Sequence, residues 1–220
     1  MFDGNIGTWH GKIYDIKLKP HAEPYHGKHF PVPRIHEITF KNNIDRLEAL
    51  KVINKVNRSL WGAPTFLIPK KDSKVRFISD FRELNKRILR QPYPIPKIQD
   101  LLLRLEGFCY GITLDLNMGY YHIELSDKYK ELCTIINQWS KYEYQRLPMG
   151  LCNSPDIIQE KMSELFVGFD IVCVYIDDLL HVTKISWKEY LCVNFNVSDK
   201  TSTSFNRALD YLKRERGLIL

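Results

Sequence analysis

The sequence predicts an α+β fold, on three observations. The chain has 220 residues, of which 44% are hydrophobic, enough for one large domain or two small ones with an apolar core. Short runs of β-branched and aromatic residues are separated by tight polar turns, which is typical of antiparallel hairpins. Apolar residues at helical spacing lie between these runs. Within residues 110–182, the order strand, helix, strand, strand favours a split βαβ sheet with its helices on one face.

The first third of the chain predicts one helix and one hairpin. Residues 1–36 are rich in His, Pro and Gly, which is typical of an extended lead-in or linker. Apolar residues recur at helical spacing over Asn43–Val56 and predict a helix there. Two strands, an apolar one over Thr65–Ile68 and an alternating one over Val75–Asp80, flank the polar turn Lys70–Lys74. We therefore expect a hairpin with a basic tip.

Prolines mark the crossover to the next part of the chain. The series Pro92, Pro94 and Pro96 is incompatible with a helix and predicts an extended segment. An amphipathic helix is expected over Ile98–Leu105, ending at Gly107, because glycine readily adopts the left-handed conformation that ends helices.

The second half of the chain predicts a strand, two helices and a hairpin before the final segment. Apolar residues over Tyr110–Leu116 predict a buried strand. A short helix is expected over 127–132 with Ser126 as its N-cap. A longer helix is expected to begin at Ser154, because proline follows it at the first helical position. The stretch 133–147 predicts another hairpin.

Two adjacent aspartates, Asp177 and Asp178, stand at the turn of a last apolar hairpin over 171–182. Adjacent like charges repel, so a fold that holds them together needs a cation nearby. Asp115 adds a third carboxylate at the end of the upstream strand. Three oxygen donors at strand ends suit Mg²⁺, which prefers oxygen ligands and assists phosphoryl transfer. Taken alone, the pair also fits an ordinary turn, where aspartate is common.

Basic charge is concentrated in one window. The whole chain carries a net charge of +6, whereas residues 41–100 hold 14 Lys and Arg against 6 Asp and Glu, a net charge of +8. A basic lobe beside an acidic pocket suits a metal-using enzyme that acts on a polyanion such as nucleic acid. A solvated basic face is the alternative.

Cysteine spacing and hydropathy argue against a zinc-binding, a disulfide-rich or a membrane-spanning protein. The five cysteines are widely spaced, with no Cys-x-x-Cys pair, which favours a reducing compartment over a zinc site or a disulfide framework. No apolar run approaches the ~20 residues of a membrane span. We therefore predict no membrane association.

Short motifs follow one another in a fixed order along the chain. They are Trp61–Pro64, Lys70–Arg76, Asp80–Asn85, Tyr93–Pro96, Leu114–Leu116, Gly119–Tyr121, Leu147–Leu151, Asn153–Pro155 and Tyr175–Asp178. Together they resemble the reverse transcriptase domain of gypsy-type (Metaviridae-like) long-terminal-repeat retrotransposons, relatives of retroviral polymerases. The resemblance covers roughly residues 8–191, and an ordered series of motifs is far more specific than any one of them.

The resemblance implies a two-metal nucleotidyl transfer, in which dNTPs extend a primer 3′-hydroxyl on an RNA or DNA template. It implies that Asp115, Asp177 and Asp178 are the catalytic carboxylates, with Asp178 in the less direct role. Asp115 and Asp177 would bridge two Mg²⁺ ions, with Mn²⁺ as an alternative, and Leu116 would offer its backbone carbonyl to the metal.

The resemblance also implies a site for the incoming dNTP. Lys70, or the lysine beside it, and Arg76 would grip its phosphates. Tyr120 would stack under the sugar and exclude a 2′-hydroxyl, with a place in the core as its alternative. Met149 and Gly150 would line the loop beside the nucleotide and the template.

The family's right-hand polymerase architecture implies a division of the chain. Fingers are expected from residues 37–90 and 123–152, and a palm from 91–122 and 153–191, after the lead-in. The thumb is expected to be absent. Residues 192–220 diverge from the family pattern, as if mis-joined.

Two functions follow from these features. The three carboxylates and the basic fingers favour an RNA-directed DNA polymerase domain. An absent thumb favours a catalytically inactive, nucleic-acid-binding remnant of a retroelement, because the thumb clamps the duplex. The resemblance implies a primed template and dNTPs as partners. It also implies an intracellular location, in a cytoplasmic virus-like particle or in the nucleus.

Overall fold

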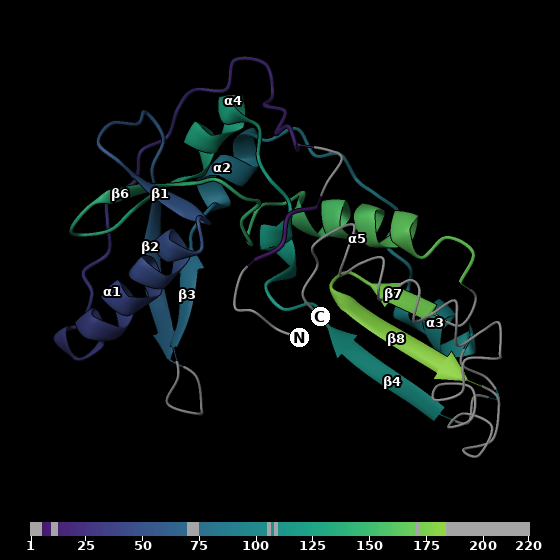
Figure 1. Cartoon of the computed structure of the whole chain (residues 1–220). Coiled ribbons are helices and arrows are strands. Elements are labelled where there is room, and N and C mark those ends of the chain that lie inside the picture. The colour runs from purple at the N-terminus through teal and green to yellow at the C-terminus, as the bar shows by residue number, and fades with distance from the viewer. Residues whose placement is uncertain are drawn as a thin grey trace. The chain divides into compact units, whose positions relative to one another are not determined.

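The computed structural model describes residues 6–9, 13–69, 75–104, 107, 110–169 and 172–183. The chain divides into two units, one formed by residues 11–90 and 120–154 and the other by residues 1–10, 91–119 and 155–220. Each unit has its own β-sheet (Figure 1), so we call them the five-stranded unit and the three-stranded unit. Helices and strands are both present, which confirms the predicted α+β class. The Lys70–Lys74 tip and the tail 192–220 lie outside the described residues.

The two predicted hairpins of the five-stranded unit are confirmed, and they join into one sheet. All its neighbouring strands are antiparallel except β2 and β5, which pair in parallel at Ala63–Ile135 and Pro64–Ile136. The Thr65 hydroxyl donates a hydrogen bond to the Ile136 carbonyl at 2.9 Å and reinforces this join. The strand order is β1 (Ile53–Val56), β6 (Lys141–Tyr144), β5 (Thr134–Ile136), β2 (Ala63–Pro69) and β3 (Val75–Ser79).

The first helix lies earlier in the chain than the sequence predicted. Helix α1 spans Arg34–Ala49, so it begins within the expected lead-in 1–36. The end of the helix predicted over 43–56 is instead strand β1. The expectation was therefore wrong at both ends of this helix.

A backbone turn at Lys51 explains where α1 ends. Lys51 has a positive φ of 55°, and its N–H donates to the Glu48 carbonyl at 2.9 Å. The N–H of Val52 donates to the Leu47 carbonyl, also at 2.9 Å. These two bonds form a Schellman motif, which usually has glycine at the left-handed position. Because lysine occupies it here, the sequence carried no stop signal.

Helix α1 packs against the sheet through one aromatic side chain. Phe40 is 0% exposed, and its ring centroid lies 5.3 Å from that of Phe77 on β3 and 5.6 Å from that of Trp139 in the β5–β6 turn. Ile44 and Leu47 are buried on the same face, as the helical spacing predicted. The helix runs beside β2 and β3 in Figure 1.

The three-stranded unit has the split βαβ topology that the sequence predicted. Its strands are ordered β4 (Tyr110–Asp115), β8 (Asp178–Thr183) and β7 (Val172–Tyr175). Both outer strands are antiparallel to β8, so β4 and β7 are parallel to each other with β8 between them. Helix α5 (Ser154–Leu165) comes between β4 and β7 in the sequence and lies along this sheet (Figure 1).

The predicted helices of the three-stranded unit are confirmed. Ile157, Ile158 and Met162 are buried on α5, and Gly168 beyond its end has a φ of +84°. Helix α3 spans Ile98–Arg104 and follows the proline-rich segment, which has no regular structure.

Short helices complete the five-stranded unit. They are α2 (Arg82–Arg87), α4 (Asp127–Lys130) and the 3₁₀ turn Glu131–Cys133; a second 3₁₀ turn, Gly119–His122, leads into the unit. The helix predicted after Ser126 is thus confirmed, and Ser126 is its N-cap residue, with an extended backbone but without the side-chain hydrogen bond that a serine cap usually makes. The buried Ser126 hydroxyl has no hydrogen-bond partner. Within the described part of the chain, no helix is long and apolar enough to span a membrane.

We expect Phe40→Ala to lower the free energy of unfolding by ~3–5 kcal/mol, because it deletes a fully buried ring and leaves a cavity. Chemical denaturation followed by tryptophan fluorescence measures this change. Ile38→Ala on the same helix is the matched control, since Ile38 is 75% exposed. A loss for Phe40→Ala no larger than that of the control would contradict the packing described for α1.

Candidate functional site

Pairing of β4 with β8 brings predicted catalytic residues together. Asp115, the last residue of β4, is the register partner of Asp178, the first residue of β8. The Leu116 N–H donates to the Asp177 carbonyl at 3.3 Å. The backbones of all three aspartates therefore meet at one end of the three-stranded sheet, although Asp115 lies far from the other two in sequence.

The turn that carries Asp177 has an unusual backbone. Ile176 and Asp177 link β7 to β8, and Ile176 has a φ of +57°. A positive φ at the first turn position and not at the second is the pattern of a type II′ turn, in which the first position normally holds glycine. A residue with a Cβ that is held in such a sparsely populated backbone region costs on the order of 1–3 kcal/mol. The sequence placed both aspartates in the turn, whereas Asp178 in fact begins β8.

A buried glutamine of α5 contacts this turn. The Gln159 Oε1 accepts a hydrogen bond from the Ile176 N–H at 2.7 Å. Its Nε2 donates to the Val174 carbonyl at 3.4 Å and to the Ser163 hydroxyl at 3.1 Å. Sequence reasoning assigned Gln159 no role. The available signal was a polar residue within a helical segment whose neighbours Ile157 and Ile158 are apolar.

Gly119, in the loop after β4, lies close to Leu116 and to the turn. The Gly119 N–H donates to the Leu116 carbonyl at 3.3 Å. A Cβ built at Gly119 would lie 3.0 Å from the Leu116 Cβ and 3.8 Å from the Asp177 Cβ, so this close approach favours glycine. The Leu116 carbonyl, expected to face a metal, thus accepts one hydrogen bond and retains a second lone pair.

The residues predicted to bind the nucleotide belong to the five-stranded unit, apart from Lys70, which lies outside the described residues. Arg76 is exposed on β3 opposite Ile68. Tyr120 is half-buried, and the ring of its neighbour Tyr121 stacks on Tyr144 at a centroid distance of 6.2 Å. Burial raises the pKa of the Tyr121 hydroxyl, which therefore stays neutral.

An asparagine on α2 holds the loop that contains Met149 and Gly150. The Asn85 Nδ2 donates to the Gly150 carbonyl at 2.8 Å, and its Oδ1 accepts from the Cys152 N–H at 2.8 Å. Gly150 has a φ of +94°, and Met149 is 52% exposed. The exposed Met149 side chain therefore stands on a loop whose backbone is fixed by Asn85 at Gly150 and at Cys152.

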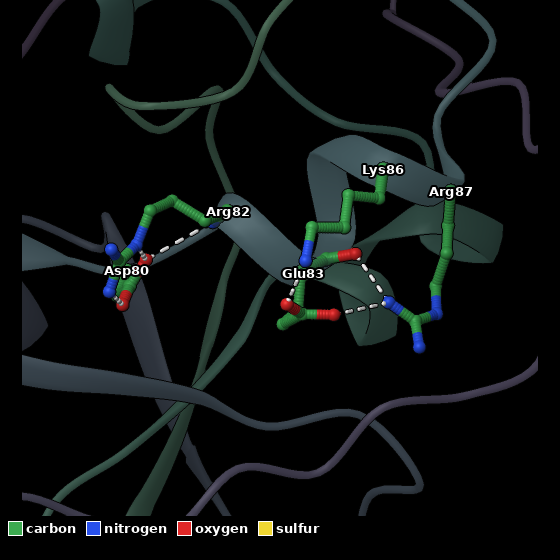
Figure 2. A network of polar contacts seen from close by, with 5 residues as sticks. All are labelled: Asp80, Arg82, Glu83, Lys86 and Arg87. Carbon is green, nitrogen blue, oxygen red and sulfur yellow. Dashed lines mark hydrogen bonds and ion pairs between the residues drawn. The ribbon is translucent and has the colours of Figure 1, made fainter.

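A network of charged side chains extends from Asp80, just before α2, along the whole of that helix (Figure 2). The Arg82 Nε and Nη2 donate to the Asp80 carboxylate at 2.8 and 2.7 Å, and these hydrogen bonds lower the pKa of Asp80. Hydrogen bonds from Lys86 and then Arg87 lower the pKa of Glu83. The Arg82 side chain remains 82% exposed. Its guanidinium group is therefore accessible to solvent while Asp80 holds it in one orientation.

The structure describes the predicted metal ligands Asp177 and Asp178 with their side chains, and Asp115 by its backbone. Among the side chains that the structure describes, no group of three or more His, Cys, Asp or Glu is arranged to hold a metal ion. Asp115 is placed here by its backbone, opposite Asp178. The Asp177 side chain is half-buried and that of Asp178 is exposed.

Comparison with known proteins adds independent information. Residues 68–198 match the family described as "Reverse transcriptase (RNA-dependent DNA polymerase)". Among curated relatives from Drosophila melanogaster, the Pol polyprotein from transposon 297 is 29% identical over 81% of this chain. That from transposon gypsy is 29% identical over 86%, and that from transposon opus is 33% identical over 72%. The matched part spans 17, 20 and 16% of these three relatives' lengths, respectively.

Solved structures share the fold. The protease-reverse transcriptase of prototype foamy virus superposes with a TM-score of 0.82 at 22% identity, over 97% of this chain and 27% of that one. The foamy viral enzyme in complex with an RNA/DNA hybrid superposes with a TM-score of 0.76 at 21% identity, over 87% of this chain and 25% of that one. The family match covers more than half of the sequence. The chain therefore belongs to the reverse transcriptase (RNA-dependent DNA polymerase) family.

Proposed function

We propose that this chain is an RNA-directed DNA polymerase domain of a retrotransposon Pol polyprotein, which extends a primer 3′-hydroxyl with dNTPs. The observation that carries the proposal is the register of β4 and β8, which sets Asp115 opposite Asp178 and beside the Asp177 turn. In this proposal the three-stranded unit acts as the palm and the five-stranded unit as the fingers.

The donor set at the end of the three-stranded sheet fits Mg²⁺. Asp115, Asp177 and Asp178 supply carboxylate oxygens and Leu116 supplies a carbonyl, and hard divalent cations prefer such ligands. Mn²⁺ has similar ligand preferences. When bound, two such ions lower the pKa of the attacking hydroxyl and stabilise the charge that develops on the phosphates. Asp115 and Asp177 would hold the ions in this proposal, while Asp178 has the less direct role of orienting these two carboxylates or contributes weakly.

The five-stranded unit would bind the incoming nucleotide. Arg76, exposed on β3, supplies a planar fork for phosphate oxygens, and Lys70 supplies a second positive charge. Tyr120 excludes the 2′-hydroxyl of a ribonucleotide by its bulk. The Met149–Gly150 loop lies beside the base, where the Asn85 hydrogen bonds keep its backbone fixed.

The partner is a primed RNA or DNA template. The foamy viral enzymes that share this fold have been solved with double-stranded DNA and with an RNA/DNA hybrid, which supports a duplex ligand here. The basic window 41–100 carries a net charge of +8 and would contact the phosphates. The similarity to transposon polyproteins supports action inside the cell, in a virus-like particle or in the nucleus.

We expect Asp177→Asn to reduce Mg²⁺-dependent primer extension by about 10³-fold or more, because it removes a carboxylate from the proposed metal site. Binding of the RNA/DNA hybrid should be unchanged, since the exposed basic face supplies the phosphate contacts. Extension on a primed RNA template and fluorescence anisotropy measure the two quantities.

Asp45→Asn is the matched control for this variant, because Asp45 is exposed on α1 in the other unit. Equal extension by Asp177→Asn and the control would contradict the metal assignment. Salt-sensitive hybrid binding by a wild-type chain that extends no primer would instead establish the alternative function, a catalytically inactive nucleic-acid-binding remnant.

Tyr120→Ala should admit ribonucleotides, because it removes the ring that would meet a 2′-hydroxyl. The ratio of kcat/KM for dNTP to that for rNTP is expected to fall about tenfold or more, measured by single-nucleotide incorporation. Tyr121→Phe keeps the ring that stacks on Tyr144 and should leave the ratio unchanged. An unaltered ratio in Tyr120→Ala would exclude Tyr120 from the sugar site.

Arg76→Gln should lower kcat/KM for dNTP by about 10- to 100-fold, the loss expected for charge-assisted hydrogen bonds to phosphate. Steady-state incorporation at varied dNTP concentration measures it. Arg34→Gln is the control, because Arg34 is an exposed arginine of the same unit that lies outside the basic window 41–100. If both variants behave alike, the phosphate contact lies elsewhere.

A further inference from the structure

We propose that Gln159 is a positioning residue of the active site. Its side-chain amide holds Ile176 at its positive φ and thereby sets the position of Asp177. The inference rests on the proposed function only in that Asp177 is taken as catalytic. The hold of Gln159 on the turn is a property of the three-stranded unit alone.

The hydrogen-bond partners determine which way the Gln159 amide faces. The Ile176 N–H can only donate and the Val174 carbonyl can only accept. Oε1 must therefore face Ile176, at 2.7 Å, and Nε2 must face Val174, at 3.4 Å. The second N–H of Nε2 is taken by the Ser163 hydroxyl at 3.1 Å. Because Gln159 is only 2% exposed, water does not readily replace these bonds.

The backbone conformation of Ile176 requires stabilisation by neighbouring groups. Its φ of +57° is strained for a β-branched residue, and strained conformations persist only where their surroundings over-determine them. The Gln159 amide bonds to the strained residue itself and to the strand just before it. Without the amide, Ile176 is expected to relax toward an ordinary conformation.

Relaxation at Ile176 would move the adjacent Asp177. The Asp177 carbonyl also accepts a hydrogen bond from the Leu116 N–H at 3.3 Å, and Leu116 directly follows Asp115. The turn is thus held both from α5 and from the end of β4. Loss of the bonds from α5 removes one restraint on the position of Asp177 relative to Asp115, and small displacements of catalytic groups cause large losses of rate.

Three variants of the full chain separate positioning from simple support of the fold. Gln159→Met keeps the length and burial of the side chain but removes both groups that bond to the turn. Ser163→Ala is the matched control. It removes the hydrogen bond of the Gln159 amide to Ser163 and keeps its bonds to Ile176 and Val174. Gln159→Met combined with Ile176→Gly tests for rescue, since glycine adopts a positive φ without strain.

We expect Gln159→Met to lower kcat for primer extension by about 10- to 100-fold, with KM for dNTP within about threefold because the nucleotide contacts belong to other residues. Hydrogen exchange of the Ile176 amide should speed up, while amides of β4 and α5 keep their protection. Ser163→Ala should match the wild type in both measurements. The combination with Ile176→Gly should recover a large part of kcat.

Two results would overturn the inference. One is unchanged exchange at Ile176 in Gln159→Met. The other is a loss of protection throughout the three-stranded unit without rescue by Ile176→Gly, which would make Gln159 a core residue only. If the wild-type chain extends no primer, the proposed function fails. Selective loss of protection at Ile176 would then still support the hold on the turn, and unchanged exchange would refute it.

Discussion

The ladder between β4 and β8 is the interaction on which the candidate site depends. Six residue pairs, from Tyr110–Thr183 to Asp115–Asp178, align the two strands, and Leu179 and Val182 are buried along β8. This pairing opposes the repulsion between carboxylates that it brings together. A slip of one residue would turn every side chain of β8 to the other face of the sheet. The ladder with β4 therefore also determines where Asp178 lies relative to Asp115.

At the end of this ladder, the strained backbone of Ile176 is held by a hydrogen bond to a neighbouring helix. Ile176 occupies a turn position that glycine normally fills, and a buried amide from α5 bonds to it. Such strain is typical of functional sites whose surroundings hold them in one geometry. Helix α5 can do this because its apolar residues Ile158 and Met162 are fully buried. The same helix thus builds the core and orients the proposed catalytic turn.

Sequence reasoning succeeded where a local pattern carried the signal, and failed where the residue type did not indicate the backbone turn or the hydrogen bond that forms. Asp115 at a strand end and the final hairpin followed from short apolar runs. The end of α1 was missed because Lys51, not glycine, takes the left-handed position. Ser126 has the residue type of a cap but makes no capping bond. Residue type alone does not determine which hydrogen bond a side chain forms.

The sequence by itself determined the α+β class, most helices and strands, and the family, because periodicity and ordered motifs are local properties. The tertiary structure decided three further features: the parallel join of β2 to β5, the pairing of Asp115 with Asp178, and the contact of Gln159 with Ile176. Each joins segments that are separated in the sequence. Their register depends on how buried faces pack together, and no periodicity within one segment records it.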